Sequence, residues 1–246
     1  MPEAHFRFYE ELNDFLPVDR RRQEFRVFFD EPRNVKHLIE SVGVPHTEVE
    51  IILANGESVG FDYLVRDGDF VSVYPVFELL DVRSLVRVRE APLRDTRFLA
   101  DAHLAGLARR LRMAGFDTVL AGSEADAALV RRAVAEGRIL LTRDLELLKH
   151  RELTHGLYVR AVKPLEQFRE VLLRLDLAAS MRPFTRCTVC NGAVDEVEAE
   201  VVADRVPDAV RARHARFARC DGCGRVYWEG SHWRRMREVL TRAVSA

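Results

Sequence analysis

The sequence predicts an α/β protein whose central part is a parallel sheet flanked by helices. Between residues 97 and 181, short apolar runs alternate with amphipathic segments, which is typical of parallel strands joined by right-handed helical crossovers. Two acidic residues, Asp101 and Asp144, each follow one of these apolar runs. The carboxyl ends of parallel strands meet at one edge of a sheet, where such folds place their functional sites. We therefore expect both carboxylates at that edge.

The elements of the central part follow from apolar periodicity. A strand is predicted at 98–100, and the helix after it buries Leu104, Leu107, Ala108 and Leu111, which recur at the i, i+3, i+4, i+7 spacing of one helix face. Further strands are predicted at 118–120, 139–142 and 157–159, and further helices at 123–136, 145–149 and 164–177. The last of these helices has proline at its start, a favoured position.

The N-terminal part has the pattern of a small α+β domain. Strands are predicted at 5–9, 24–29, 48–53, 57–60 and 69–76, and a helix at 34–42 with Asn34 as its N-cap. The dipeptide Asn55-Gly56 predicts a tight hairpin turn between two of the strands. Residues 81–96 are predicted to form a linker, in which Val82, Val86 and Val88 alternate with charged residues and favour a short strand.

Composition excludes several classes of protein. The chain has 246 residues, of which 48% are hydrophobic and 31% charged, as expected of a globular protein with a substantial core. No run approaches the roughly 18 apolar residues of a membrane span, so we expect no membrane association. The first residues, MPEAHFRFYEEL, lack the basic and apolar regions of a secretory signal, and we expect a cytoplasmic protein.

Charge is distributed unevenly along the chain. Residues 1–90 hold 11 basic and 18 acidic residues (net −7), residues 91–181 hold 15 and 12 (net +3), and residues 182–246 hold 12 and 9 (net +3). The negative charge of the first third therefore disfavours nucleic-acid binding, whereas the positive charge of the remainder is compatible with nucleic-acid binding. Ordinary variation between domains explains the asymmetry equally well.

Three aspartates are candidate ligands of a catalytic metal ion: Asp101, Asp126 and Asp144, with Glu124 and Glu146 as additional acids. Hard divalent cations take oxygen ligands, and a pair of such ions can activate water and stabilise the leaving oxygen of a phosphodiester. Helix capping is the alternative: Asp101 and Asp144 precede helices, and Ser123 with Asp126 has the spacing of a capping box. Three acids at one sheet edge would repel one another without a cation, which favours the metal site.

All four cysteines fall in two CxxC pairs, Cys187/Cys190 and Cys220/Cys223, with 29 residues between the pairs. Four thiolates form a closed tetrahedral site for structural Zn²⁺, although this spacer is longer than usual. Without a secretory signal, disulfides are not expected. A redox dithiol is the weaker alternative, because one pair would suffice for it.

Basic and aromatic residues provide candidate RNA contacts. Arg109 and Arg112 are i, i+3 neighbours that could hold a phosphate, and Trp228, His232 and Arg234 could stack bases and contact phosphates of single-stranded RNA. The alternatives are a solvated helix face for the two arginines and a tryptophan packed beneath a small zinc module. Arg143 could contact RNA or pair with a carboxylate. The segment 233–244 is predicted to be an amphipathic helix.

The stretch ILANGESVGFDYLVRDGDFVSVYP resembles the closing half of the β-grasp fold of ubiquitin and of the sulfur-carrier proteins. Those carriers end in an activated diglycine, whereas this segment continues as Pro75-Val76-Phe77-Glu78. The resemblance therefore implies a β-grasp domain with a role in protein interaction or stability rather than in sulfur transfer.

The motifs FLAD, LARRLRMAGFDT, EADAAL and GRILLTRD resemble the PIN-like RNase domain of the Mut-seven C-terminal family. In that family a ubiquitin-like domain often precedes the nuclease domain and a four-cysteine ribbon often follows it, in the order seen here. The resemblance implies a Mg²⁺- or Mn²⁺-dependent ribonuclease in which Asp101, Asp126 and Asp144 bind the metal. Glu124 or Glu146 would supply a fourth acid.

These observations predict an α/β protein with three modules: a ubiquitin-like β-grasp domain (1–80), followed after the linker (81–96) by a PIN-like nuclease domain (97–181) and a four-cysteine zinc ribbon with a C-terminal helix (182–246). The predicted activity is metal-dependent hydrolysis of RNA. The alternative is a non-catalytic RNA- or ribosome-binding adaptor, and a third hypothesis is a protein-interaction module led by the N-terminal domain.

Overall fold

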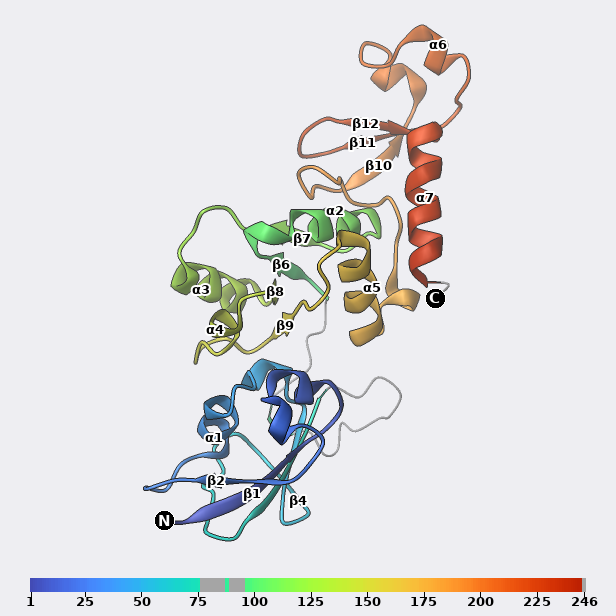
Figure 1. The fold of residues 1–246 in the computed structure, drawn as a ribbon. Coiled ribbons are helices and arrows are strands. Elements are labelled where there is room, and N and C mark those ends of the chain that lie inside the picture. Colours follow the sequence, from blue (N-terminus) through green and yellow to red (C-terminus); the bar gives the residue numbers. More distant parts are fainter. Residues whose placement is uncertain (76–86, 89–95, 245–246) are drawn as a thin grey trace. The chain divides into compact units, whose positions relative to one another are not determined.

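The structure, a computed structural model, describes residues 1–75, 87–88 and 96–244 (Figure 1). Most of the predicted linker, together with its proposed strand, lies outside these residues. The chain divides into two compact units, one formed by Met1–Asp95 with Ala125–Tyr158 and the other by Thr96–Glu124 with Val159–Ala246. None of the helices in the described ranges has the length and apolar character needed to cross a membrane.

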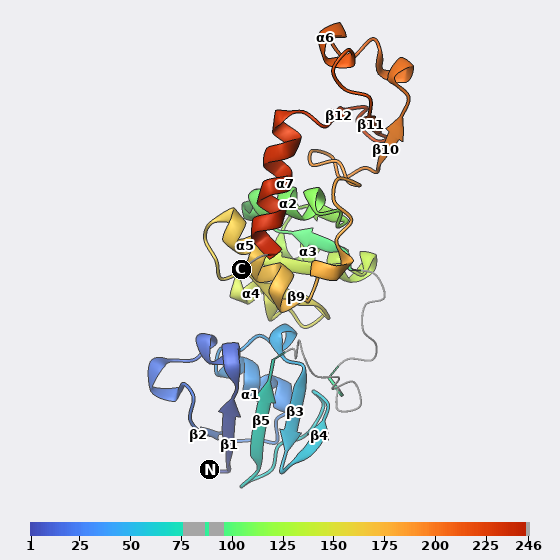
Figure 2. The ribbon, with the colours of Figure 1, turned by 90° about the vertical axis from the view of Figure 1, so that its right-hand side faces the viewer.

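The N-terminal part forms a five-stranded sheet with the order β2-β1-β5-β3-β4 (Figure 2). Its elements are β1 (Glu3–Phe8), β2 (Phe25–Phe28), α1 (Val35–Ser41), β3 (Ile51–Ala54), β4 (Glu57–Val59) and β5 (Phe70–Tyr74). β1 and β5 run parallel and the other pairs antiparallel. Apolar side chains of α1 share one buried cluster with those of β1 and β5, so the helix covers one face of the sheet. The predicted small α+β domain is confirmed.

Local sequence explains the limits of these elements. Asn34 caps α1, because its side chain accepts a hydrogen bond from the His37 amide at 2.9 Å. Asn55 and Gly56 both have positive φ, 52° and 88°, which is the requirement of the predicted hairpin turn. β3 begins at Ile51 rather than at Glu48, because residues His46–Glu48 form a short 3-10 helix.

The central part is a four-stranded sheet with the order β7-β6-β8-β9. The strands are β6 (Phe98–Ala100), β7 (Thr118–Leu120), β8 (Ile139–Thr142) and β9 (Gly156–Tyr158), and the helices are α2 (Ala105–Met113), α3 (Asp126–Glu136), α4 (Leu145–Leu148) and α5 (Pro164–Arg174). The pairs β6–β7 and β8–β9 are parallel. Leu104, Leu107, Ala108 and Leu111 are buried as predicted, and proline is the first residue of α5.

The predicted end of α5 at residue 177 is wrong, because the helix ends at Arg174. The start of α3 was also predicted wrongly. The prediction placed the start of α3 at Ser123, with Ser123 and Asp126 as a capping box. The helix begins at Asp126, and its N-cap is Ala125, which makes no side-chain capping hydrogen bond. Ala125 has an extended backbone (φ −70°, ψ 151°), so Ser123 lies outside the helix and cannot cap it.

The C-terminal part contains a three-stranded antiparallel sheet, β10 (Val194–Val197), β11 (Phe217–Cys220) and β12 (Val226–Trp228), followed by α7 (Ser231–Val244). Only the first four residues of the acidic run 194–202 form a strand, which ends at Val197, and a 3-10 helix follows at Ala199–Val202. Together with the short helix α6 (Asp208–Arg211), this excursion accounts for the long spacer between the cysteine pairs. Val202, Val206 and Phe217 form a small core against which Trp228 packs.

The N-terminal domain contacts the last strand of the central sheet within the first compact unit. The Glu48 carboxylate, 2% exposed, accepts a hydrogen bond from the Tyr158 amide of β9 at 2.5 Å. The buried ring of His46 lies 2.6 Å from Glu40 Oε1 through Nδ1 and 2.8 Å from the Leu153 carbonyl oxygen through Nε2.

We expect Glu48→Ala to lower the free energy of unfolding by about 1–3 kcal/mol, because it leaves the Tyr158 amide without an acceptor in a buried position. Urea denaturation would measure the change. Glu57→Ala, which removes an exposed carboxylate from β4 of the same domain, is the matched control and should change stability by less than about 0.5 kcal/mol. Equal stability of the two variants would contradict the proposed role of Glu48.

Candidate functional site

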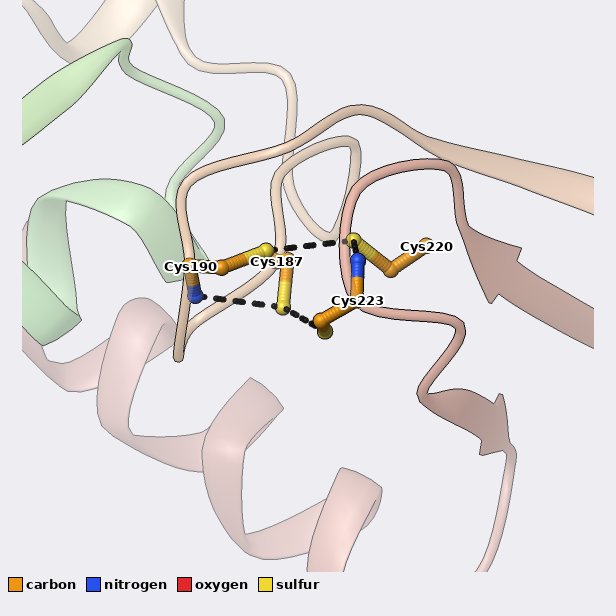
Figure 3. A group of neighbouring side chains, drawn as sticks. All are labelled: Cys187, Cys190, Cys220 and Cys223. Atoms are coloured by element: carbon orange, nitrogen blue, oxygen red, sulfur yellow. Dashed lines mark hydrogen bonds between the residues drawn. The ribbon is translucent and has the colours of Figure 1, made fainter.

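The four cysteines converge in the C-terminal part, where their side chains point toward one another from two loops (Figure 3). The sulfur atoms all lie within 4.8 Å of one another, and the Sγ–Sγ distances are 3.6 Å for Cys187–Cys223 and 3.4 Å for Cys190–Cys220. A tetrahedron of zinc–sulfur bonds about 2.3 Å long has edges of about 3.8 Å. The donors therefore fit a tetrahedral ion, and the cluster could bind a structural metal such as zinc.

Hydrogen bonds around the cluster favour ionisation of one thiol. Burial opposes ionisation of Cys187, but the backbone amides of Cys190 and Val189 and the Tyr227 hydroxyl donate to its sulfur, and the net effect lowers the pKa of Cys187 to about 6. The Tyr227 oxygen lies 3.0 Å from this sulfur. Burial raises the pKa of Cys220 to about 12. A bound cation would remove the repulsion that opposes further thiolates.

Arg112 connects this ribbon to the central sheet. This residue is 7% exposed. Its Nε donates to the Thr118 carbonyl oxygen at 2.7 Å. Its Nη1 donates at 2.8 Å to the carbonyl oxygen of Val189, which lies in the first cysteine loop. Arg112 was a candidate phosphate contact, with a solvated helix face as the alternative, and its burial against two carbonyl oxygens fits neither interpretation. Burial lowers the pKa of Arg112, and the negative charges of Cys187 and Cys190 oppose this shift.

Asn191 makes the second connection between the ribbon and the sheet. Its side chain accepts from the Thr118 amide of β7 at 2.9 Å and donates to Asp117 Oδ1 at 2.7 Å. Asn191 has φ 71°, a left-handed conformation that asparagine tolerates better than most residues. The sequence prediction missed both Asn191 and Tyr227. The position of Asn191 directly after Cys190 was the available signal, since a turn residue is needed there.

The candidate acids lie at the predicted points of the chain. Asp101 follows β6 directly. Asp144 follows β8 after Arg143 and caps α4, accepting hydrogen bonds from the amides of Glu146 and Leu147 at 2.8 and 3.4 Å. Asp126 opens α3.

Among the described residues, the cysteines are the group of possible metal ligands whose donor atoms all lie within 4.8 Å. The additional acids lie near the candidate aspartates in the sequence: Glu124 is half-buried, and Glu146 accepts a hydrogen bond from Lys149 at 2.8 Å. Asp101 belongs to one compact unit, whereas Asp126 and Asp144 belong to the other. The convergence of the three carboxylates stays a prediction.

The remaining candidate RNA contacts are accessible. Arg109 and Arg143 are exposed, as are His232 and Arg234 at the start of α7, and Trp228 is half-buried. Trp228 contacts the small core of the ribbon, so the packing interpretation of this residue is confirmed. Packing leaves part of its ring accessible for other contacts.

The fold and the sites define the class of the protein: a three-part chain in which a parallel sheet with acidic residues after its strands is joined to a four-cysteine ribbon. Comparison with protein families identifies the family. Residues 96–240 match the Mut7-C RNAse domain and residues 1–81 match the Mut7-C ubiquitin domain. The chain therefore belongs to the Mut7-C RNAse domain family, which makes it a member of a ribonuclease family with an N-terminal ubiquitin-like domain.

The resemblance noted in the sequence is thus confirmed. No curated protein and no solved structure matches the chain.

We expect the purified protein to contain about one zinc ion per chain, because four thiolates complete one closed site. Elemental analysis by mass spectrometry would measure it. Cys223→Ser should lose most of the metal, whereas Ser231→Ala, a conservative change outside the cluster, should retain it. Full zinc content in Cys223→Ser would contradict a four-cysteine site.

We expect Arg112→Ala to lower the free energy of unfolding by about 2–4 kcal/mol, because the buried carbonyl oxygen of Thr118 and the partly buried one of Val189 lose a charged donor. Arg109→Ala is the matched control, since it removes an exposed arginine from the same helix. Chemical denaturation of both variants, each with its zinc content, would show whether Arg112 stabilises the ribbon. A loss no greater than that of Arg109→Ala would argue against this role.

Proposed function

We propose that this protein is a PIN-like, Mg²⁺- or Mn²⁺-dependent ribonuclease that hydrolyses RNA phosphodiester bonds. The observation that carries the proposal is the match of residues 96–240 to the Mut7-C RNAse domain, within which Asp101 and Asp144 follow strands of one parallel sheet. Asp101, Asp126 and Asp144 are the proposed ligands, with Glu124 or Glu146 as a fourth acid.

The donor chemistry of these residues fits a hard divalent cation. All of the candidates offer carboxylate oxygens, which Mg²⁺ and Mn²⁺ prefer. Asp126 and Asp144 are exposed, so their carboxylates are accessible to a hydrated ion. Two hydrogen bonds fix the orientation of Asp144. Its backbone amide donates to Thr142 Oγ1 at 3.0 Å, and its carboxylate accepts from the Glu146 amide in the first turn of α4.

In the proposed reaction, the three aspartates would hold the metal ion. An ion held there would supply a water of lowered pKa and would stabilise charge on the phosphate oxygens. Asp144 stays oriented by its two backbone donors, so little reorganisation is needed when substrate binds. Arg109 and Arg143, both exposed, are proposed to neutralise phosphates of the bound strand.

We assign the four-cysteine cluster to structural Zn²⁺. Four sulfur ligands leave no position open for water or substrate, which distinguishes a structural from a catalytic zinc site. The proposed role of the ribbon is to present RNA, and Trp228, His232 and Arg234 are its proposed contacts.

A non-catalytic RNA-binding adaptor is the second candidate function. The observation that favours it is the capping role of Asp144, which by itself explains an acid at that position. In that case the N-terminal ubiquitin-like domain would bind a protein partner.

Cleavage by an Asp144→Asn variant separates the two functions. Asparagine is as good an N-cap as aspartate, so the fold should persist while a metal ligand is lost, and we expect kcat to fall by at least about 100-fold. The assay would follow a mixed RNA substrate with and without added Mg²⁺ or Mn²⁺. Asp204→Asn, which alters an exposed acid of the ribbon, is the control. Metal-dependent cleavage that survives in Asp144→Asn would contradict the proposed site.

A further inference from the structure

A cavity of about 130 Å³ lies in the C-terminal part, bounded by the three-stranded sheet and the start of α7. Five of its thirteen lining residues are aromatic, and the acids Glu196 and Glu229 line it as well. Phe184 and Trp233 lie with their ring centroids 5.1 Å apart and their planes tilted by 34°, and Tyr227 and Trp228 line the cavity with them. The chain has two tryptophans, and both line this cavity. None of the proposed catalytic acids is involved.

The rim of the cavity carries both hydrogen-bond donors and acceptors. Arg216 donates to the Glu196 carboxylate through Nε and Nη2, at 2.9 and 3.1 Å, and both residues line the cavity together with Thr188. This ion pair is exposed, with 68% and 62% of the two side chains accessible. A flat, polar-edged ring would therefore find aromatic faces inside and hydrogen-bonding groups at the entrance.

A second, open groove runs along α7 and shares Trp233 with the cavity. Arg234, Arg237 and Arg242 line this groove with a single acid, Glu238. The Arg237 guanidinium lies 5.4 Å from the centre of the Trp233 ring. Arg234 and Arg237 are separated by about 4.5 Å along the helix axis. Both therefore place a positive charge on the groove that adjoins the cavity at Trp233.

We propose that the cavity and the groove form one binding site for single-stranded RNA, in which an unpaired base enters the cavity beside Trp233 and the adjoining phosphates contact Arg234 and Arg237. This proposal deepens the proposed ribonuclease function by locating where substrate is held. The line of arginines requires a polyanion, and the aromatic walls require a ligand with flat rings. An acidic peptide satisfies the first requirement only. Duplex RNA also satisfies the first requirement only, because its bases are paired and stacked and cannot enter the cavity.

Tryptophan fluorescence provides a direct test, since both tryptophans line the cavity. The full-length Asp144→Asn protein, without added divalent metal, would be titrated with a 12-nucleotide single-stranded RNA, the same RNA as a duplex, and polyglutamate. We expect saturable quenching by the single strand and little by the duplex or the peptide. Quenching by polyglutamate equal to that by RNA would overturn the proposal, as would RNA binding detected by anisotropy without quenching.

Variants locate the site. Trp233→Ala should weaken RNA binding roughly tenfold, whereas Trp233→Phe, which retains a stacking ring and guards against loss of folding, should stay within about threefold. Arg234→Ala/Arg237→Ala should weaken binding and reduce the slope of log affinity against log salt by about 1.4. Arg213→Ala/Arg219→Ala removes the same charge from exposed positions that line neither the cavity nor the groove, and should have little effect.

Equal weakening by the two double variants would overturn the proposed site. Because binding is measured in the Asp144→Asn background, this result is independent of whether the protein cleaves RNA. Absence of metal-dependent cleavage by the wild-type protein, with intact quenching by single-stranded RNA, would count against the nuclease site alone. Intact cleavage by Trp233→Ala with unchanged RNA affinity would count against the cavity alone.

Discussion

The two edge strands of the parallel sheet must satisfy backbone amides that no further strand pairs, since unpaired edges favour aggregation and buried unpaired amides are costly. The chain meets this constraint with one side chain at each edge. At β9 the buried carboxylate of Glu48 accepts from the Tyr158 amide, and at β7 the side-chain oxygen of Asn191 accepts from the Thr118 amide. The flanking modules thereby complete the sheet that carries the proposed catalytic acids.

At the ribbon edge, Arg112 links the packing of the sheet to the cysteine cluster. Its guanidinium donates to the carbonyl oxygens of Thr118 and Val189, and it lies close enough to Cys187 and Cys190 to interact with their charges. Such outer contacts orient ligands and tune a metal site. The Tyr227 hydroxyl contacts the Cys187 sulfur from β12. The order of the metal cluster and the covering of β7 therefore depend on the same few side chains.

Much of this arrangement could be predicted from the sequence, at the positions where a single physical signal determines the local structure. Apolar runs located β6, β7 and β8 to the residue, and paired cysteines located the metal cluster. Predictions failed where a polar residue has a tertiary partner. Glu48 was assigned to a strand and Arg112 to a phosphate contact or a solvated face, but each is buried against a backbone group distant in the sequence. Periodicity carries no information about such partners, and the start of α3 was misplaced because Ser123 has capping chemistry without helical geometry.

The interleaving of the two compact units affects how the protein can be made. Residues 96–124 are synthesised before 125–158, yet they belong with 159–246. As the chain leaves the ribosome, β7 is complete long before Asn191 exists to cover it, so a translation product that ends between β7 and Asn191 would carry an open strand edge. Neither unit can be released by a single proteolytic cut. A nascent chain should therefore gain solubility late, when the second cysteine pair has emerged and the ribbon closes.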